Sequence, residues 1–209
     1  MPEIIQLPQF TRDAEVRSGS FNEQANTIDV IWTTGATVRR RNWMDGEFDE
    51  ELVVNPASVR LDRLNSGAPF LDTHSGYSLS SVIGSVVPGS ARIEAGRGLA
   101  TIQLTRREDA KGTVQDIRDG VIRNISAGYK IWTVEKQERK GRIPLMRATD
   151  WEPWEISAVP IPADPGARVR SGDAKLETFA CQVVHSLADQ NEIRRIRLGM
   201  EQRMAGLGR

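Results

Sequence analysis

RNISAGYKIW, residues 123–132, has the pattern of a β-strand with a serine near its centre. Successive side chains of a strand point to opposite faces, which gathers apolar residues on one face of this segment: Ile125, Ala127, Tyr129 and Ile131. The other face carries Ser126, Gly128 and Lys130. We therefore expect Ser126 to lie on an open face of the sheet, beside a glycine that leaves room above the hydroxyl.

Further short strands flank this segment on both sides. Alternating apolar residues predict strands in these ranges: 26–33, 48–54, 68–76 (running into a loop), 81–87, 91–95, 98–105, 143–151 and 152–162. Helical spacing predicts a short helix over 55–67, with Asn55 as N-cap and Gly67 at its end, and a second helix over 108–122. Many strands without βα alternation favour a mainly β fold with flanking helices (α+β), built on an antiparallel barrel or sandwich.

The chain divides by its pattern into three parts. Residues 1–25 are mostly polar and precede the first alternating run, which indicates a mobile N-terminal arm. Residues 26–170 form the core domain. Residues 171–209 form a C-terminal extension, in which one apolar stripe predicts a helix over 174–190: Leu176, Phe179, Ala180, Val183, Val184 and Leu187. Residues 190–209 then hold five Arg against two Glu, which is typical of an appendage with its own partner or of a cleavable extension.

Composition excludes several classes of protein. Lys and Arg together number 28, as do Asp and Glu, so no whole-chain field attracts nucleic acid or an anionic membrane. Cys181 is the single cysteine, and neither a disulfide framework nor a zinc site is expected. A mean hydropathy of -0.41 and the lack of a long apolar run or a signal-like N-terminus indicate a soluble globular protein. Nucleotide-binding and zinc-protease motifs are missing, so we expect no cofactor and no metal. GxSxG is missing too, which excludes the nucleophile elbow of an α/β-hydrolase at Ser126.

Two histidines are available for proton chemistry near neutral pH. His185 lies opposite the apolar stripe of its predicted helix, as expected for a solvated surface residue. His74 follows an apolar strand and precedes the loop SGYSLSS, where a side chain can line a cleft. These local patterns make His74 a candidate base and Ser126 a candidate nucleophile, while an ordinary loop histidine and a small strand residue are the simpler interpretations of the two positions.

Three motifs in order carry a resemblance: LDTHSG (71–76), IRDGVIRNISAGYKI (117–131) and WEISAVPIPADPGARV (154–169). Together they resemble the prohead proteases of tailed bacteriophages, over about residues 25 to 170. The third motif is the most specific, because eight of its residues match the family pattern: Glu155, Ser157, Val159, Pro160, Pro162, Ala163, Pro165 and Ala167.

The resemblance implies a serine peptidase with the barrel-plus-helices fold of the herpesvirus assembly proteases. It implies Ser126 as nucleophile, His74 as general base and acid, and Glu155 as the residue that orients His74. Asp72 and Asp150 are rivals for that third role. The herpesvirus enzymes use a second histidine there, but His185 lies outside the matching region. Donors for the oxyanion, including Arg168 in the loop 161–169, stay unassigned.

The function implied by the resemblance is cleavage of scaffold and capsid proteins, and of the protease itself, inside an immature phage head. The expected location is the cytoplasm of a bacterial host, with the gene on a phage or prophage. A homodimer is expected only by analogy with the herpesvirus enzymes, and no membrane or specific nucleic acid is expected as a partner. The run Arg39–Arg41 is interpreted as a solvated loop, with an acidic scaffold or capsid surface as the alternative.

Two other functions remain open. The chain can be a non-catalytic scaffold or capsid-associated module that keeps the fold, or the protease part of a longer protease-scaffold polyprotein. The C-terminal extension fits a targeting or self-cleaved segment in either case.

Overall fold

The computed structural model describes residues 3–8, 10–16, 20–42, 46–160 and 178–185. Within these ranges it is a mainly β structure, in which twelve strands belong to one sheet. The strands are β1 (Glu3–Pro8), β2 (Phe10–Val16), β3 (Thr27–Thr33), β4 (Val38–Asn42), β5 (Gly46–Leu52), β6 (Pro69–Asp72), β7 (Val82–Val86), β8 (Arg92–Glu94), β9 (Arg97–Leu104), β10 (Asn124–Gln137), β11 (Leu145–Ala158) and β12 (Thr178–His185).

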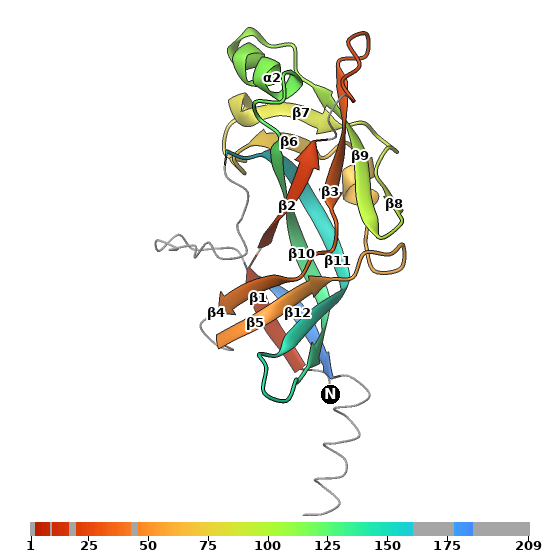
Figure 1. The fold of residues 1–209 in the computed structure, drawn as a ribbon, viewed down its shortest axis with the longest axis vertical. Helices are drawn as coiled ribbons and strands as arrows, with labels where there is room; N and C mark the ends of the chain where they lie inside the picture. The colour runs from red at the N-terminus through yellow and green to blue at the C-terminus, as the bar shows by residue number, and fades with distance from the viewer. Residues whose placement is uncertain (1–2, 9, 17–19, 43–45, 161–177, 186–209) are drawn as a thin grey trace, which may run out of the picture.

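Helices are short and lie around the sheet (Figure 1). They are α1 (Asp62–Asn65), α2 (Lys111–Arg118) and the 3-10 turns η1 (Leu79–Ser81) and η2 (Glu108–Ala110). The helix expected over 55–67 is reduced to one turn, because residues 58–60 pair with β11 instead. The Trp151 amide donates to the carbonyl of Ser58, and the Arg60 amide donates to the carbonyl of Trp151. Asn55 accepts hydrogen bonds from the amides of Ala57 and Ser58 in a separate turn before this bridge.

The helix expected over 108–122 is confirmed in its central part, where α2 follows the turn η2 and places Val114 and Ile117 in the hydrophobic core. It ends at Arg118, and Val121 is exposed beyond it.

Two long strands, β10 and β11, pair antiparallel and run through the whole molecule (Figure 1). The N-terminal half of β10 pairs with β2, and its C-terminal half pairs with β12. The C-terminal half of β11 pairs with β6, and its N-terminal half pairs with β5. One half of the molecule therefore contains β2, β3, β9, β7 and β6, and the other contains β1, β12, β5 and β4.

The sheet is mixed, so the expectation of an antiparallel architecture is wrong in part. Three of its pairings are parallel: β10 with β12, β11 with β5, and β11 with β6. The strand order ends at β1 on one side and β4 on the other, so the sheet as a whole is not closed into a barrel. Within it, the β10–β11 pairing links β10, β2, β3, β9, β7, β6 and β11 in a circuit of neighbours. Alternation along a strand does not encode the direction of its partner, which is why the sequence did not reveal the parallel pairs.

The N-terminal arm expected over residues 1–25 is wrong for most of its length. Residues 3–8 form β1, which pairs with β12, and residues 10–16 form β2, which pairs with β10 and β3. Both strands join partners far away in the sequence, so tertiary pairing rather than a local pattern orders them.

The helix expected over 174–190 is also wrong where the structure describes it. Residues 178–185 form β12, between β1 and β10. Cys181 and Val183 are buried while Ala180 and Gln182 are exposed, which is the two-residue period of a strand. Phe179 and Val183 fit both the helical stripe and this alternation, and the sequence pattern was therefore ambiguous. The structure thus extends beyond the domain boundary expected at residue 170.

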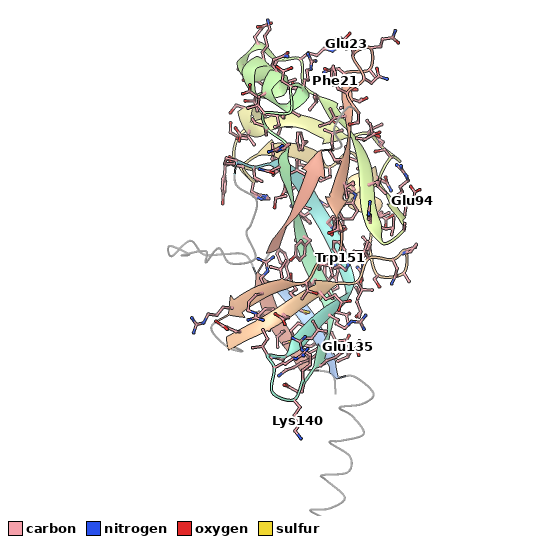
Figure 2. All side chains as sticks on the ribbon, in the orientation of Figure 1. Phe21, Glu23, Glu94, Glu135, Lys140 and Trp151 are labelled. Atoms are coloured by element: carbon pink, nitrogen blue, oxygen red, sulfur yellow. The ribbon has the colours of Figure 1, made fainter. Side chains whose placement is uncertain are left out.

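An aromatic cluster lies where the two halves meet. The Trp151 ring packs edge-on against Trp32, with centroids 6.0 Å apart, and against Tyr129 at 5.7 Å. Figure 2 shows Trp151 at this junction, with Glu135 and Lys140 toward one end of the molecule and Phe21 and Glu23 toward the other. All three rings of the cluster are fully buried. They connect β3, β10 and β11 into one core.

No helix among the described residues is long and apolar enough to cross a membrane.

The single cysteine tests the placement of β12. Burial raises the pKa of the Cys181 thiol to about 12. At pH 8 only about one thiol in 10⁴ is then ionised, so we expect a disulfide reagent such as dithiobis-nitrobenzoate to react at least about 100-fold more slowly with the native protein than in urea. The matched control is the double variant Cys181→Ala, Ala180→Cys, which moves the thiol to the exposed neighbouring position. Equal native rates for the two proteins would contradict this placement of β12.

Candidate active site

Ser126 and Glu155 lie on neighbouring strands, on the same face of the sheet. In the β10–β11 pairing, Ser126 is opposite Ser157 and Gly128 is opposite Glu155. Directly opposite residues of an antiparallel pair share a face, so these four positions form one patch. The register shifts immediately after Gly128, as at a β-bulge.

His74 reaches this patch from the end of β6. The last residue of β6, Asp72, pairs with Ala158 of β11, and His74 follows two residues later. Its Nδ1 lies 2.6 Å from Oε1 of Glu155, although 81 residues separate the two in the sequence. His74 remains partly exposed, whereas Glu155 is buried. Three strands therefore bring the three candidate residues to one region of the sheet.

The turn that carries His74 has an unusual backbone. Thr73 has φ of 49° and His74 has φ of 61°, both in the left-handed region that non-glycine residues avoid at a cost of about 1–2 kcal/mol each. Two hydrogen bonds to β11 hold this turn in place. The Thr73 amide donates to the carbonyl of Ala158 at 2.9 Å, and the His74 amide donates to Oγ of Ser157 at 3.2 Å. Such strain is maintained only where surrounding contacts fix the conformation, and it concentrates at functional sites.

Ser157 completes the hydrogen-bond network. Its hydroxyl donates to Oε2 of Glu155 at 2.5 Å while accepting from the His74 amide. Both oxygens of the Glu155 carboxylate are thus engaged, one by His74 and one by Ser157. An ionised carboxylate only accepts hydrogen bonds, so Nδ1 of His74 carries the proton and its Nε2 remains available as a base. Ser157 was absent from the sequence-based site, yet its spacing of two residues from Glu155 on a strand already indicated a shared face.

The Ser126 hydroxyl is buried and unpaired among the residues that the structure describes. The side chain of Ser126 is 2% exposed, and its Oγ has no partner within the described part of the chain. The expectation that Ser126 lies on an open face is therefore wrong, because both faces of β10 are covered at this point. Buried hydroxyls are almost always paired, so an unpaired one opposite Ser157, which itself bonds the His74 amide and Glu155, calls for a functional explanation.

The rival acidic residues lie elsewhere. Asp150 forms an ion pair with Arg60 at 2.6 Å, opposite Thr133 in the other half of β10. Asp72 is exposed on β6, and the carboxylate that hydrogen-bonds the His74 ring is that of Glu155. Arg168 and the loop 161–169 lie outside the described residues, as does the side chain of His185.

The arginine run is not a solvated loop as expected. It lies on β4, where Arg39 pairs with Asp49 and Arg40 contacts the buried Glu50. Within the described ranges, no cluster of three or more His, Cys, Asp or Glu side chains is suited to hold a metal ion.

The hydrogen-bonded pair of His74 and Glu155 is suited to accept a proton from a hydroxyl group. A carboxylate that accepts from Nδ1 fixes the tautomer of the imidazole and stabilises its protonated form. An imidazole with a free Nε2 can accept a proton from a nearby alcohol and return it to a leaving group. This is the chemistry of a serine nucleophile activated by a histidine base.

Comparisons with known proteins agree with this chemistry. A family model described as caudovirus prohead serine protease matches residues 46–181. A curated relative, named major capsid protein, from Halomonas phage phiHAP-1, is 32% identical over 131 residues. The match covers 62% of this chain but only 22% of the relative's length. No solved structure matches the chain.

Two facing serines give a test of the hydrogen-bond network. Ser157→Ala leaves Oε2 of Glu155 and the His74 amide without their partner, and we expect a loss of about 1–3 kcal/mol in the free energy of unfolding. Ser126→Ala removes a buried hydroxyl that has no hydrogen-bond partner among the described residues, and we expect no loss and a gain of up to about 1–3 kcal/mol, because the cost of burying that hydroxyl is removed. Urea unfolding followed by tryptophan fluorescence measures both variants. Equal losses would contradict the distinct roles of the two hydroxyls.

Proposed function

This chain belongs to the caudovirus prohead serine protease family, and on that premise we propose that it is a serine endopeptidase that cleaves capsid and scaffold proteins, and itself, during maturation of a phage head. The observation that carries the proposal is the contrast between two buried serines. Ser157 is fully hydrogen-bonded in the network of His74 and Glu155, whereas the facing Ser126 has no partner among the described residues. A buried hydroxyl with no hydrogen bond of its own to give up is suited to react once a base takes its proton, and the position of Ser126 opposite Ser157 supports His74 as that base.

In the proposed mechanism, Ser126 attacks the carbonyl carbon of the scissile peptide bond. As the Oγ–C bond forms, the hydroxyl proton passes to Nε2 of His74. Glu155 accepts the hydrogen bond from Nδ1 throughout and stabilises the imidazolium. Ser157 holds the other oxygen of the carboxylate, which keeps its orientation fixed.

Collapse of the tetrahedral intermediate then breaks the C–N bond. Nε2 of His74 returns its proton to the leaving amine, and the acyl group remains on Ser126. Water attacks the ester carbonyl while His74 takes one of its protons. When the Oγ–C bond breaks, His74 returns that proton to Ser126, and the carboxylic acid product leaves.

The match to a capsid protein supports a second candidate. The relative from phage phiHAP-1 carries the name major capsid protein, and the matching region is about a fifth of it. A homologous domain thus occurs within a longer protein of the shell. The present sequence can accordingly act as one part of a protease-capsid or protease-scaffold polyprotein, or as a capsid-associated module without activity.

Three finer features are part of the proposal. The circuit of strands that includes β10 and β11 supports a herpesvirus-type barrel. Family membership and the capsid-protein relative support action inside the procapsid, in the bacterial cytoplasm. Self-cleavage in the C-terminal extension and a homodimer rest on analogy with the related proteases.

A variant that lacks the proposed nucleophile distinguishes an active protease from an inactive capsid-associated module. We expect co-expression of the chain with the capsid and scaffold proteins of the same phage to give defined fragments, measured by intact mass. Ser126→Ala should abolish them, because removing the nucleophile of such a site costs on the order of 10⁴ to 10⁶ in rate. Identical fragments from both proteins, or none from the wild type in assembled proheads, would refute the protease and favour the capsid-associated module.

Amide substitutions of three acidic residues test the third member of the site in the same assay. Glu155→Gln keeps the shape of the side chain but removes its negative charge and replaces one of its two acceptor oxygens with an amide donor, so the tautomer of His74 is no longer fixed and we expect a loss of about 10⁴ in rate. Asp72→Asn and Asp150→Asn should stay within about twofold of the wild type, because neither carboxylate contacts His74. A fully active Glu155→Gln protein would remove Glu155 from the mechanism.

A further inference from the structure

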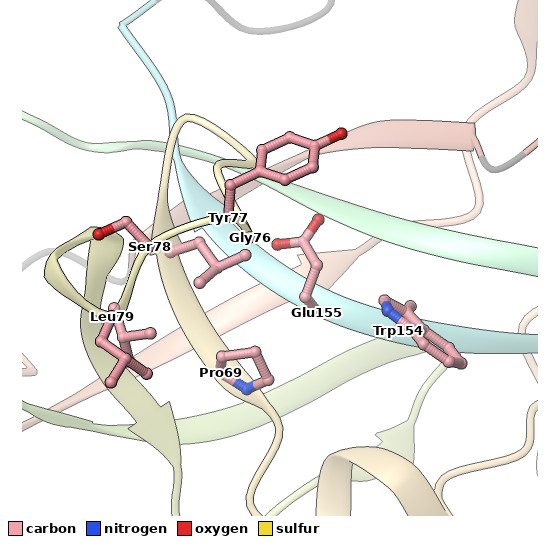
Figure 3. A pocket seen from close by; sticks show the side chains of 9 residues that line it. Pro69, Gly76, Tyr77, Ser78, Leu79, Trp154 and Glu155 are labelled. Carbon is pink, nitrogen blue, oxygen red and sulfur yellow. The ribbon is translucent and has the colours of Figure 1, made fainter. Parts of the chain in front are cut away.

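A pocket opens beside the His74–Glu155 pair. It has a cavity volume of about 300 Å³ and is lined mainly by β6, the loop that follows His74, and two residues of β11. Its lining includes Leu71, Gly76, Tyr77, Leu79, Trp154 and Glu155. Figure 3 shows the Glu155 carboxylate pointing toward the loop that carries Gly76 and Tyr77. The pocket thus shares one of its residues with the candidate active site.

The walls of this pocket are apolar in character. Glu155 is the single ionisable acid among the lining residues, and its two oxygens already accept hydrogen bonds from His74 and Ser157. A basic side chain in the pocket would compete with those hydrogen bonds. No Lys or Arg is among the described residues that line the cavity. An acidic side chain that entered the pocket would therefore have no cationic lining residue to pair with.

The rim of the pocket exposes large apolar side chains on an ordered loop. Leu79 is 85% exposed, and Tyr77 is completely exposed. The loop is nevertheless anchored, because Arg107 donates to the carbonyls of Leu79 and Ser80, both at 2.7 Å. Ser81 also bonds the hydroxyl of Ser75 across the loop at 3.0 Å. An anchored loop that presents apolar side chains to solvent is pre-organised for contact with a partner.

On the opposite wall of the pocket, two cationic side chains lie against the ring of Trp154. Arg63 lies 3.2 Å from the ring centroid of Trp154, and the Lys130 ammonium lies 3.3 Å from it. Arg63 also donates to the Trp154 carbonyl at 3.2 Å. These contacts hold the indole in one orientation.

We infer that this pocket binds an apolar side chain of the substrate polypeptide, one or two residues from the scissile bond, and that Leu79 and Tyr77 determine this specificity. The inference rests on the proposed function. Glu155 lies opposite Gly128, two residues along β10 from Ser126, which is about 7 Å. An extended substrate covers that distance in about two residues, so the side chain that enters belongs to the immediate neighbourhood of the cleaved bond. Arg107 acts as a positioning residue for the rim.

A mixture of short, unstructured synthetic peptides of defined sequence provides the test. After incubation with the full chain, mass spectrometry identifies each bond that is cleaved. We expect enrichment of leucine, methionine or phenylalanine near the bond over aspartate and lysine. Leu79→Asp should lower kcat/KM for the apolar peptides at least about tenfold, mainly through KM, because it places a charge at the rim.

Ile4→Asp is the matched control. Ile4 is also exposed, at 66%, but lies on β1 in the other half of the sheet, so this variant should cleave like the wild type. Cleavage that depends on Ser126 but shows no apolar preference, or that Leu79→Asp leaves unchanged, overturns the inference and leaves the protease intact. Absence of any Ser126-dependent cleavage overturns the proposed function itself.

Discussion

The antiparallel pairing of β10 with β11 is the constraint on which the site depends. Its register places Ser126 opposite Ser157 and Gly128 opposite Glu155, so one face of two strands carries the proposed nucleophile and the carboxylate. The same two strands bind every other part of the sheet, through β2 and β12 on one side and β6 and β5 on the other. A slip of one residue would turn these side chains to the opposite face and separate them from His74.

The parallel pairing of β6 with β11 positions His74, the third residue of the candidate site. It ends at Asp72, and the left-handed turn at Thr73 and His74 then directs the imidazole to Glu155. Ser157 links that turn to the carboxylate, so it orients both partners at once. The energy cost of the strained turn is offset by hydrogen bonds to β11, and this arrangement leaves only the Ser126 hydroxyl of the patch without a partner among the described residues.

Sequence reasoning reached the candidate residues, because His74, Ser126 and Glu155 each lie in a motif with recognisable neighbours. It assigned no role to Ser157, although this serine belongs to the third motif and shares a face with Glu155, because its second partner, the His74 amide, lies 83 residues away in the sequence. It placed Ser126 on an open face, because alternation reports which side chains share a face but not what covers that face. The strand β12 was mistaken for a helix because Phe179 and Val183 satisfy both periods, and only pairing with β1 and β10 decides between them.

The central claim is that His74 activates Ser126, and covalent labelling tests it most directly. A fluorophosphonate reacts with a serine whose hydroxyl is deprotonated by a neighbouring base, and the adduct is located by peptide mass mapping. The account predicts one adduct, on Ser126, that disappears in His74→Ala and is absent from the equally buried Ser157. An adduct on another serine, no adduct, or labelling of Ser126 that persists without His74 would contradict it.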